Sequence, residues 1–136
     1  MARILLIDDD GGVRRTVRRL LERAGHAVLE AGDGEEGLRL HREWRPELII
    51  ADIFMPQVDG LELILELRRE AAAVPIVIMS GGDGSGTLDL RKEAALLGAA
   101  HTLRKPCAPA DLIGIVTSLL PPSSSPAPVE RAPPEG

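Results

Sequence analysis

Five short apolar runs, each followed by a segment with helical spacing, constrain the fold of this chain more than any other feature. The runs are bounded by turn-forming residues, which is typical of strands buried in a parallel sheet. We expect strands at residues 3–7, 27–31, 48–51, 76–79 and 101–104.

The segments that follow these runs predict amphipathic helices. The first carries apolar residues on one face, namely Val13, Val17, Leu20 and Leu21. Gly25 follows its last turn as a stop signal. The others are expected at about 35–44, 61–72, 88–97 and 109–119. Regular alternation of strand and helix predicts an α/β fold: a doubly wound, five-stranded parallel sheet with helices on both faces. Right-handed crossovers leave a few strand orders open.

Length and composition predict one domain followed by a tail. With 136 residues, 44% of them hydrophobic and 1% aromatic, the chain can build a single aliphatic core. We expect this domain to span residues 1–120. Residues 121–136 read PPSSSPAPVERAPPEG and contain too few apolar groups to offset their ordering entropy. They are expected to form a disordered tail or a linker, after which an output domain would follow in a longer protein.

Charge and composition also exclude several classes of protein. The net charge is −5, and no aromatic residues are interleaved with basic ones, so we expect no nucleic-acid surface in this segment. No apolar stretch is long enough for a membrane span, and the N-terminus lacks a signal-peptide core. Cys107 is the single cysteine, so an intrachain disulfide is impossible. We expect a cytoplasmic protein that does not bind membranes.

Acidic residues and one lysine follow three of the expected strands. Asp8 and Asp9 follow the first strand, Asp52 the third, and Lys105 the fifth. The carboxyl ends of parallel strands share one edge, where ligands bind. Carboxylates that meet there repel one another unless a cation lies among them. The sequence therefore predicts a divalent-metal site with an acidic nucleophile and a lysine. The next residue, Asp10, is expected to cap the following helix.

Short motifs in a fixed order resemble the receiver domain of two-component response regulators, of the chemotaxis type. They are LLIDDD at 5–10, AGDGEEGL at 31–38, DIFMP at 52–56, DG at 59–60, VIMSG at 77–81, GA at 98–99 and KP at 105–106. The resemblance spans about residues 3–120. It implies a flavodoxin-like (βα)5 fold with the strand order 2-1-3-4-5.

The resemblance also implies a metal site for this chain. Asp9, Asp52 and the backbone carbonyl of Phe54 would hold Mg²⁺, and Asp8 would act mostly through water. Carboxylates with waters and phosphate oxygens are the ligands that Mg²⁺ prefers, which agrees with the acidic pattern.

A phosphoryl site is implied beside the metal. Asp52 would accept a phosphoryl group from a sensor histidine kinase or a histidine phosphotransfer protein. Ser80 would hydrogen-bond the bound phosphoryl group, and Lys105 would pair with one of its oxygens. The added charge would then bias a two-state element. The signal would pass by protein–protein contact to a downstream effector or a C-terminal output domain.

Two other functions compete with this one. A phosphorylation-independent adaptor on the same fold would not need the acidic residues, Ser80 or Lys105. A hydrolase that acts through an aspartyl-phosphate would usually carry a second acid two residues after its nucleophile, where this chain has Phe54. We therefore expect a phosphoacceptor signalling domain and not an enzyme. Its catalysis would be limited to its own phosphorylation and slow dephosphorylation.

The chain departs from the family pattern at several positions. Thr102 stands where the family commonly has an aromatic switch residue, and Cys107 stands where an aromatic often follows Lys-Pro. Phe54 and Gly82 occupy positions that tune dephosphorylation, and neither side chain can orient a water. We expect a long-lived phosphoryl group.

Two further patterns have alternative readings. The glycines of 32–37 match the G-x-G-x-x-G fingerprint of dinucleotide sites, but the acidic residues among them disfavour a pyrophosphate. The arginines of residues 14–23 form either a solvated helix face or, by the family resemblance, a docking face for the kinase's helical bundle.

Overall fold

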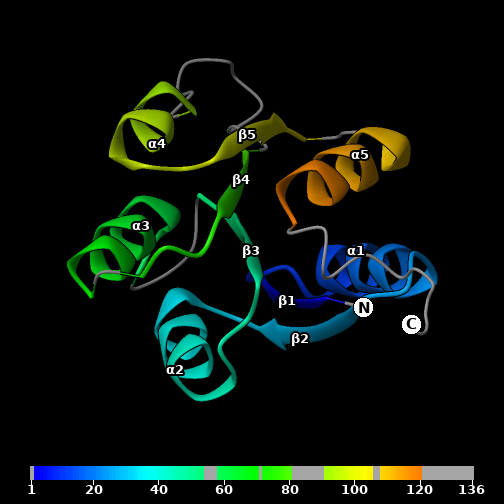
Figure 1. Ribbon diagram of the computed structural model, residues 1–136, viewed down its shortest axis with the longest axis horizontal. Helices are drawn as coiled ribbons and strands as arrows, with labels where there is room; N and C mark the ends of the chain where they lie inside the picture. The colour runs from blue at the N-terminus through cyan, green and yellow to red at the C-terminus, as the bar shows by residue number, and fades with distance from the viewer. Residues whose placement is uncertain (1, 54–57, 71, 81–90, 106–107, 121–136) are drawn as a thin grey trace, which may run out of the picture.

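A computed structural model describes residues 2–53, 58–70, 72–80, 91–105 and 108–120 of the chain. Five strands alternate with five helices (Figure 1). The strands are β1 (Arg3–Ile7), β2 (Ala27–Ala31), β3 (Leu48–Asp52), β4 (Ile76–Ser80) and β5 (His101–Arg104). The helices are α1 (Gly11–Arg23), α2 (Gly34–Trp44), α3 (Gly60–Arg69), α4 (Arg91–Leu97) and α5 (Pro109–Leu119).

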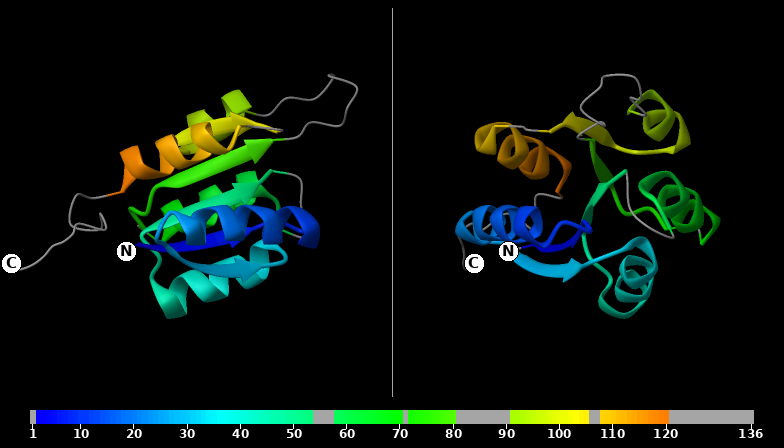
Figure 2. Two further views of the ribbon diagram at one scale, coloured as in Figure 1. Left: turned by 90° about the vertical axis from the view of Figure 1, so that its right-hand side faces the viewer. Right: turned by 180° about the vertical axis from the view of Figure 1, so that it is seen from behind.

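All five strands pair in parallel, in the order β2-β1-β3-β4-β5. The predicted α/β fold and its strand order are both confirmed. The strand arrows point to one common edge (Figure 2). Residues that end or follow the strands therefore gather at that edge, as the sequence predicted.

Alternation along each strand divides the core into two layers. In β1, Leu5 and Ile7 pack beneath α2, α3 and α4, whereas Ile4 and Leu6 pack beneath α1 and α5. Figure 1 shows these two groups of helices on opposite faces of the sheet. The layers are almost purely aliphatic, because branched side chains fill both faces of a buried parallel sheet.

Aspartates fix the start of three helices. The side chain of Asp10 accepts hydrogen bonds from the backbone N–H groups of Gly12 and Val13, which confirms its predicted capping role. Asp33 caps α2 and Asp59 caps α3 in the same way. Each helix therefore begins within a few residues of the carboxyl edge of the sheet.

Helix α3 ends earlier than predicted, at Arg69 instead of near residue 72. The Arg68 guanidinium donates to the carbonyl oxygens of Ala72 and Val74, at 2.7 and 3.3 Å, and holds the chain in its turn toward β4. The predicted start of the fourth helix, near residue 88, lies outside the described residues. The tail expected at 121–136 lies outside them as well.

Candidate functional site

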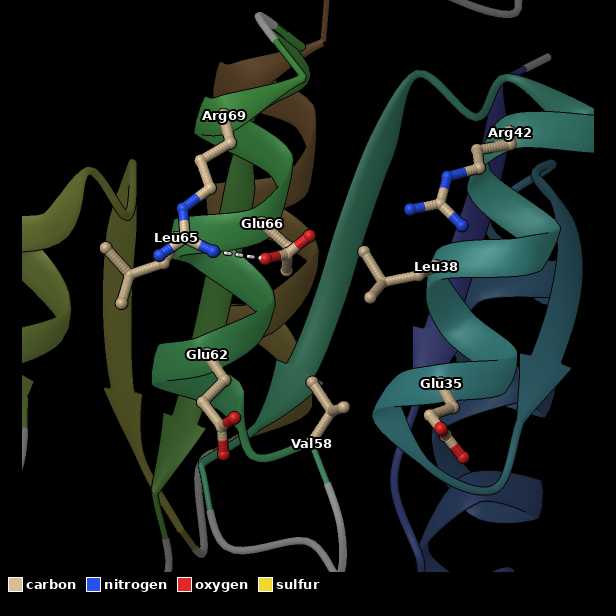
Figure 3. Close-up of a pocket in the computed structure, with 8 residues that line it drawn as sticks. All are labelled: Glu35, Leu38, Arg42, Val58, Glu62, Leu65, Glu66 and Arg69. Atoms are coloured by element: carbon tan, nitrogen blue, oxygen red, sulfur yellow. Dashed lines mark hydrogen bonds and ion pairs between the residues drawn. The ribbon is translucent and has the colours of Figure 1, made fainter.

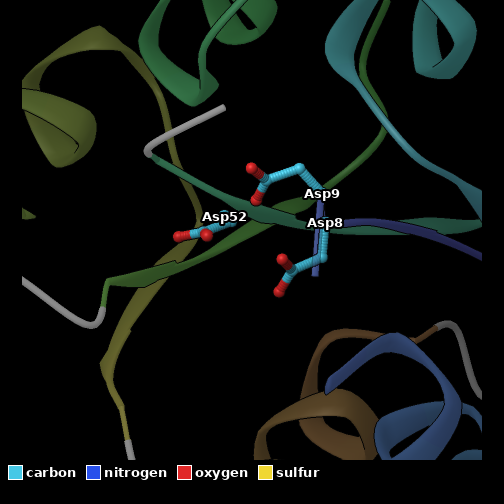
Figure 4. Close-up of side chains that lie close together, drawn as sticks. All are labelled: Asp8, Asp9 and Asp52. Carbon is cyan, nitrogen blue, oxygen red and sulfur yellow. The ribbon is translucent and has the colours of Figure 1, made fainter. Parts of the chain in front are cut away.

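Three carboxylates meet at the carboxyl edge of the sheet. Asp8 and Asp9 directly follow β1, and Asp52 is the last residue of β3. One oxygen from each of the three carboxylates lies within 4.8 Å of the others (Figure 4). Asp8 is buried, Asp52 is half-buried and Asp9 is exposed, so the cluster is open to solvent on one side. The sequence prediction that these residues converge is confirmed.

Lys105 reaches the same cluster from the end of β5. Its ammonium nitrogen lies 2.8 Å from Oδ2 of Asp8 and 3.4 Å from Oδ2 of Asp52. Burial of the ammonium lowers its pKa, but the hydrogen bond to Asp8 and the charges of Asp52 and Asp8 outweigh burial. The net pKa of Lys105 is therefore raised above its usual value. The lysine stays protonated and neutralises part of the acidic cluster.

Asp8 is the most firmly held of the three acids. Its Oδ1 accepts a hydrogen bond of 2.9 Å from the backbone N–H of Asp10. Its own N–H donates to the carbonyl of Ala31, which continues the β1–β2 ladder beyond the last strand residue. Its carbonyl oxygen accepts a hydrogen bond from Arg14, at 2.7 Å. Backbone and side chain are thus fixed before any ligand arrives.

The hydrogen bond from Arg14 belongs to a network that sequence analysis did not find. The carboxylate of Glu30, on the edge strand β2, forms ion pairs with Arg14 at 2.9 Å and with Arg18 at 2.8 Å. Two of the arginines of α1 therefore lie toward this strand. Arg15, Arg19 and Arg23 of the same helix are exposed. No local pattern signals these contacts, because twelve or more positions separate Glu30 from each arginine.

Ser80 is the last residue of β4 and lies beside Arg104 in the sheet register. It is 3% exposed, and its carbonyl oxygen accepts a hydrogen bond from the Lys105 N–H at 2.8 Å. The serine and the lysine are therefore linked through the backbone of two paired strands. Phe54, the expected carbonyl ligand, lies outside the described residues, as do Gly82 and Cys107.

Gly60 brings the start of α3 against the strand that carries Asp52. A Cβ at position 60 would lie 2.6 Å from the carbonyl oxygen of Asp52 and 2.8 Å from Cα of Ile53. The Gly60 N–H donates to the carbonyl of Ile53 at 2.8 Å. A side chain at this position would displace the backbone of the site, a constraint that the sequence alone does not disclose.

Two backbone N–H groups of the glycine pattern at 32–37 donate hydrogen bonds to side chains of the same segment. The Gly32 N–H donates to the carboxylate of Glu36, and the Glu36 N–H donates to that of Asp33. The bond to Asp33 caps α2, and both carboxylates place negative charge where a pyrophosphate would lie. The geometry agrees with the sequence argument against a dinucleotide site.

Comparison with known proteins decides the family. The protein-family model for the response regulator receiver domain matches residues 4–117 of this chain. The chain belongs to the response-regulator receiver family. It is 36% identical over 118 residues to the response regulator MprA of Mycolicibacterium vanbaalenii, covering 87% of this chain and 50% of that protein. It is 32% identical over 118 residues to the alkaline phosphatase synthesis transcriptional regulatory protein PhoP of Bacillus subtilis, covering 87% and 48%.

Solved receiver structures share the same fold. A response regulator receiver domain protein from Clostridium thermocellum has a TM-score of 0.80 at 31% identity, with 88% of this chain and 94% of that chain covered. A LuxR-family two-component response regulator from Aurantimonas has a TM-score of 0.78 at 35% identity, covering 88% and 84%.

Receiver domains are signalling domains of two-component systems. This receiver spans about half the length of the curated relatives it matches. Within the part of the chain that the structure describes, no helix is long and apolar enough to cross a membrane.

Proposed function

We propose that this receiver domain accepts a phosphoryl group on Asp52 from a sensor histidine kinase or a histidine phosphotransfer protein. The observation that carries the proposal is the convergence of three carboxylates on one ammonium at the carboxyl edge of the sheet. Asp52 is partly open to solvent, whereas Asp8 is buried and occupied by Lys105. Asp9 is exposed as well, so solvent access alone leaves two acids, and Asp52 is chosen because it holds the position of the family's phosphoacceptor.

Magnesium fits the donor set of this site. Oxygens of Asp8, Asp9 and Asp52 lie close enough for a single ion, and hard carboxylate oxygens are the ligands that Mg²⁺ selects. We assign direct contacts to Asp9 and Asp52, a contact mostly through water to Asp8, and a further one to the carbonyl of Phe54. Bound Mg²⁺ would offset the repulsion between the incoming phosphoryl group and the carboxylates.

The transfer itself needs alignment and charge neutralisation. A carboxylate oxygen of Asp52 attacks phosphorus, a bond from oxygen to phosphorus forms, and the bond from phosphorus to the histidine nitrogen of the donor breaks. Lys105 leaves Asp52 to pair with a phosphoryl oxygen, and its raised pKa keeps it charged for that task. Ser80 is assigned to hydrogen-bond the phosphoryl group, since it ends the neighbouring strand.

Signalling then follows from the new charge. Ser80 ends β4 and Lys105 follows β5, two adjacent strands that lead to α4 and α5, so a shift of either residue reaches that side of the domain. We propose that the phosphorylated form contacts a downstream effector or a C-terminal output domain, in the cytoplasm. The acyl phosphate is finally lost to water by slow self-dephosphorylation.

Incubation with acetyl phosphate, with and without Mg²⁺, tests the proposal without knowledge of the kinase. Intact-protein mass spectrometry should show the gain of one phosphoryl group that depends on Mg²⁺. A folded protein that gains none under any condition would support the phosphorylation-independent adaptor instead.

A further inference from the structure

Helices α2 and α3 present the same series of side chains. Each has a glutamate, then a leucine three residues later, then an arginine four residues after that. The two helices run in the same direction, because each follows a strand of one parallel sheet. They flank a hollow of about 470 Å³ (Figure 3). The residues of the two series all line it: Glu35, Leu38 and Arg42 on α2, and Glu62, Leu65 and Arg69 on α3.

The series on α3 is open to solvent. Leu65 is 40% exposed, and Glu62 and Arg69 are exposed on either side of it. In Figure 3, Leu65 lies on the side of α3 that is turned away from α2, at a level between Glu62 and Arg69. Glu62, Leu65 and Arg69 form an exposed row, here called the α3 crest. From the N-terminal to the C-terminal end of the helix, its side chains are negative, apolar and positive.

This crest is complementary to itself. Positions 62 and 69 are equidistant from a point between Leu65 and Glu66, so a two-fold axis through that point exchanges them. A second copy placed by this axis lies with its α3 antiparallel, and Glu62 of each copy faces Arg69 of the other. Self-complementarity about a two-fold axis is what a symmetric dimer interface requires.

We propose that the α2–α3 face is a homodimer contact in which two α3 helices pack antiparallel around Leu65. The ridge of each α3 would lie toward the hollow between α2 and α3 of the other copy, as ridges pack into grooves between helices. Helix α2 reinforces the polarity, because Glu35 lies at the same acidic end as Glu62 and Arg42 at the same basic end as Arg69.

Ion pairs within each copy do not prevent this exchange. Arg69 pairs with Glu66, three residues away, at 2.6 Å, and Arg42 pairs with Glu70. The arginine side chains of these pairs are 72% and 54% exposed, and such exposed pairs contribute little free energy. The guanidinium groups can therefore reach a carboxylate of a second copy at little cost.

The arginines of α1 are a poorer match to this face. Arg15, Arg19 and Arg23 form an exposed basic row, but the described side chains exposed on that helix include no large apolar group to meet Leu65. A second copy's α3 provides both the charges and the leucine. Because the interface holds one exposed leucine per copy, we expect a dissociation constant on the order of 100 µM.

Sedimentation equilibrium over a range of protein concentrations tests the dimer. E62R should weaken it about tenfold, because both symmetry-related pairs become repulsive. R69E should weaken it to a similar extent for the same reason. An equimolar mixture of the two variants should associate about as well as the wild type, since all the exchanged pairs are then attractive.

Two leucine variants provide a matched comparison. L65A should weaken the dimer several-fold, whereas L96A should leave it unchanged, because Leu96 is 86% exposed but lies on α4. Thermal melting checks that each variant is folded. The proposal is overturned if the wild type stays monomeric at every concentration, if L96A weakens the dimer in place of L65A, or if the mixed charge variants fail to associate. Since D52N should dimerise like the wild type, the result does not depend on phosphorylation.

Discussion

The ammonium of Lys105 donates a hydrogen bond of 2.8 Å to Oδ2 of Asp8, across 97 positions of the sequence. Their strands, β5 and β1, do not pair with each other, because β3 and β4 lie between them. The long lysine side chain thus crosses the carboxyl edge of the sheet and joins its fifth strand to its first.

Removal of that ammonium should destabilise the fold. Lys105→Met leaves the buried Asp8 carboxylate without its charged partner, so we expect the free energy of unfolding to fall by about 1–3 kcal/mol. Added Mg²⁺ should restore part of the loss, because it would supply positive charge at the same place. Urea denaturation with and without Mg²⁺ measures both effects. Lys92→Met, at an exposed position of α4, is the control and should change little. Equal stability of the wild type and K105M would show that the pair contributes nothing.

A methyl group at Gly60 should disturb both the fold and the site. Gly60→Ala places a Cβ against the backbone of Asp52 and Ile53, where no flexible side chain can give way, and we expect a loss of about 1–3 kcal/mol. Gly114 lies within α5, and a Cβ there would meet no atom within 4 Å apart from its own helix backbone and chain neighbours. Gly114→Ala should therefore stabilise the protein by about 0.5–1 kcal/mol. Chemical denaturation gives both values. A neutral effect of G60A would contradict the close approach of α3 to β3.

Two buried histidines should make the fold sensitive to mild acid. Burial lowers the pKa of His26 and of His41 below 6.5, and Nδ1 of each is buried without a hydrogen-bond partner. The unfolded chain therefore binds more protons than the folded one at mildly acid pH. The contribution of the two neutral histidines to the free energy of unfolding is fully present above about pH 6.5. It is lost as the pH falls toward their lowered pKa values, by up to about 1.4 kcal/mol per pH unit for each histidine. Unfolding free energies measured from pH 7.5 down to 5.5 should fall more steeply in the wild type than in H26Q/H41Q. Parallel pH profiles would refute the assignment.

The phosphoryl group should persist on Asp52 well beyond seconds. Phe54 and Gly82 lie outside the described residues, but by sequence neither side chain can orient an attacking water. Phe54→Glu would place a carboxylate two residues after the phosphoacceptor and should speed the loss. Mass spectra recorded over time after removal of acetyl phosphate give both rates, and loss within seconds from the wild type would show the expectation to be wrong.

Periodicity predicted most of the fold because it reflects burial. The apolar runs of β1 and β3 are buried on both faces, so their sequences alone identify parallel strands. Alternation of strand and helix in the sequence did not determine the strand order, because that order depends on packing between distant segments. That order came from the family resemblance and agrees with the observed pairing.

The candidate site could be predicted as far as the sheet edge determines it. Asp52 ends a strand, and Asp8 and Lys105 each follow one, so parallel pairing alone brings them together. The bonds from Arg14 and Arg18 to Glu30 could not be predicted, because they depend on how α1 lies on the sheet.

The most direct test of the account is the intact mass of three proteins after incubation with acetyl phosphate and Mg²⁺. These are the wild type, Asp52→Asn and Asp10→Asn. The third is a matched control, because Asp10 lies beside the cluster and asparagine keeps its capping role. We predict that the wild type and D10N each gain one phosphoryl group that EDTA prevents, and that D52N gains none. A phosphoryl group on folded D52N, or none on the wild type, would contradict the assignment of Asp52 as the phosphoacceptor.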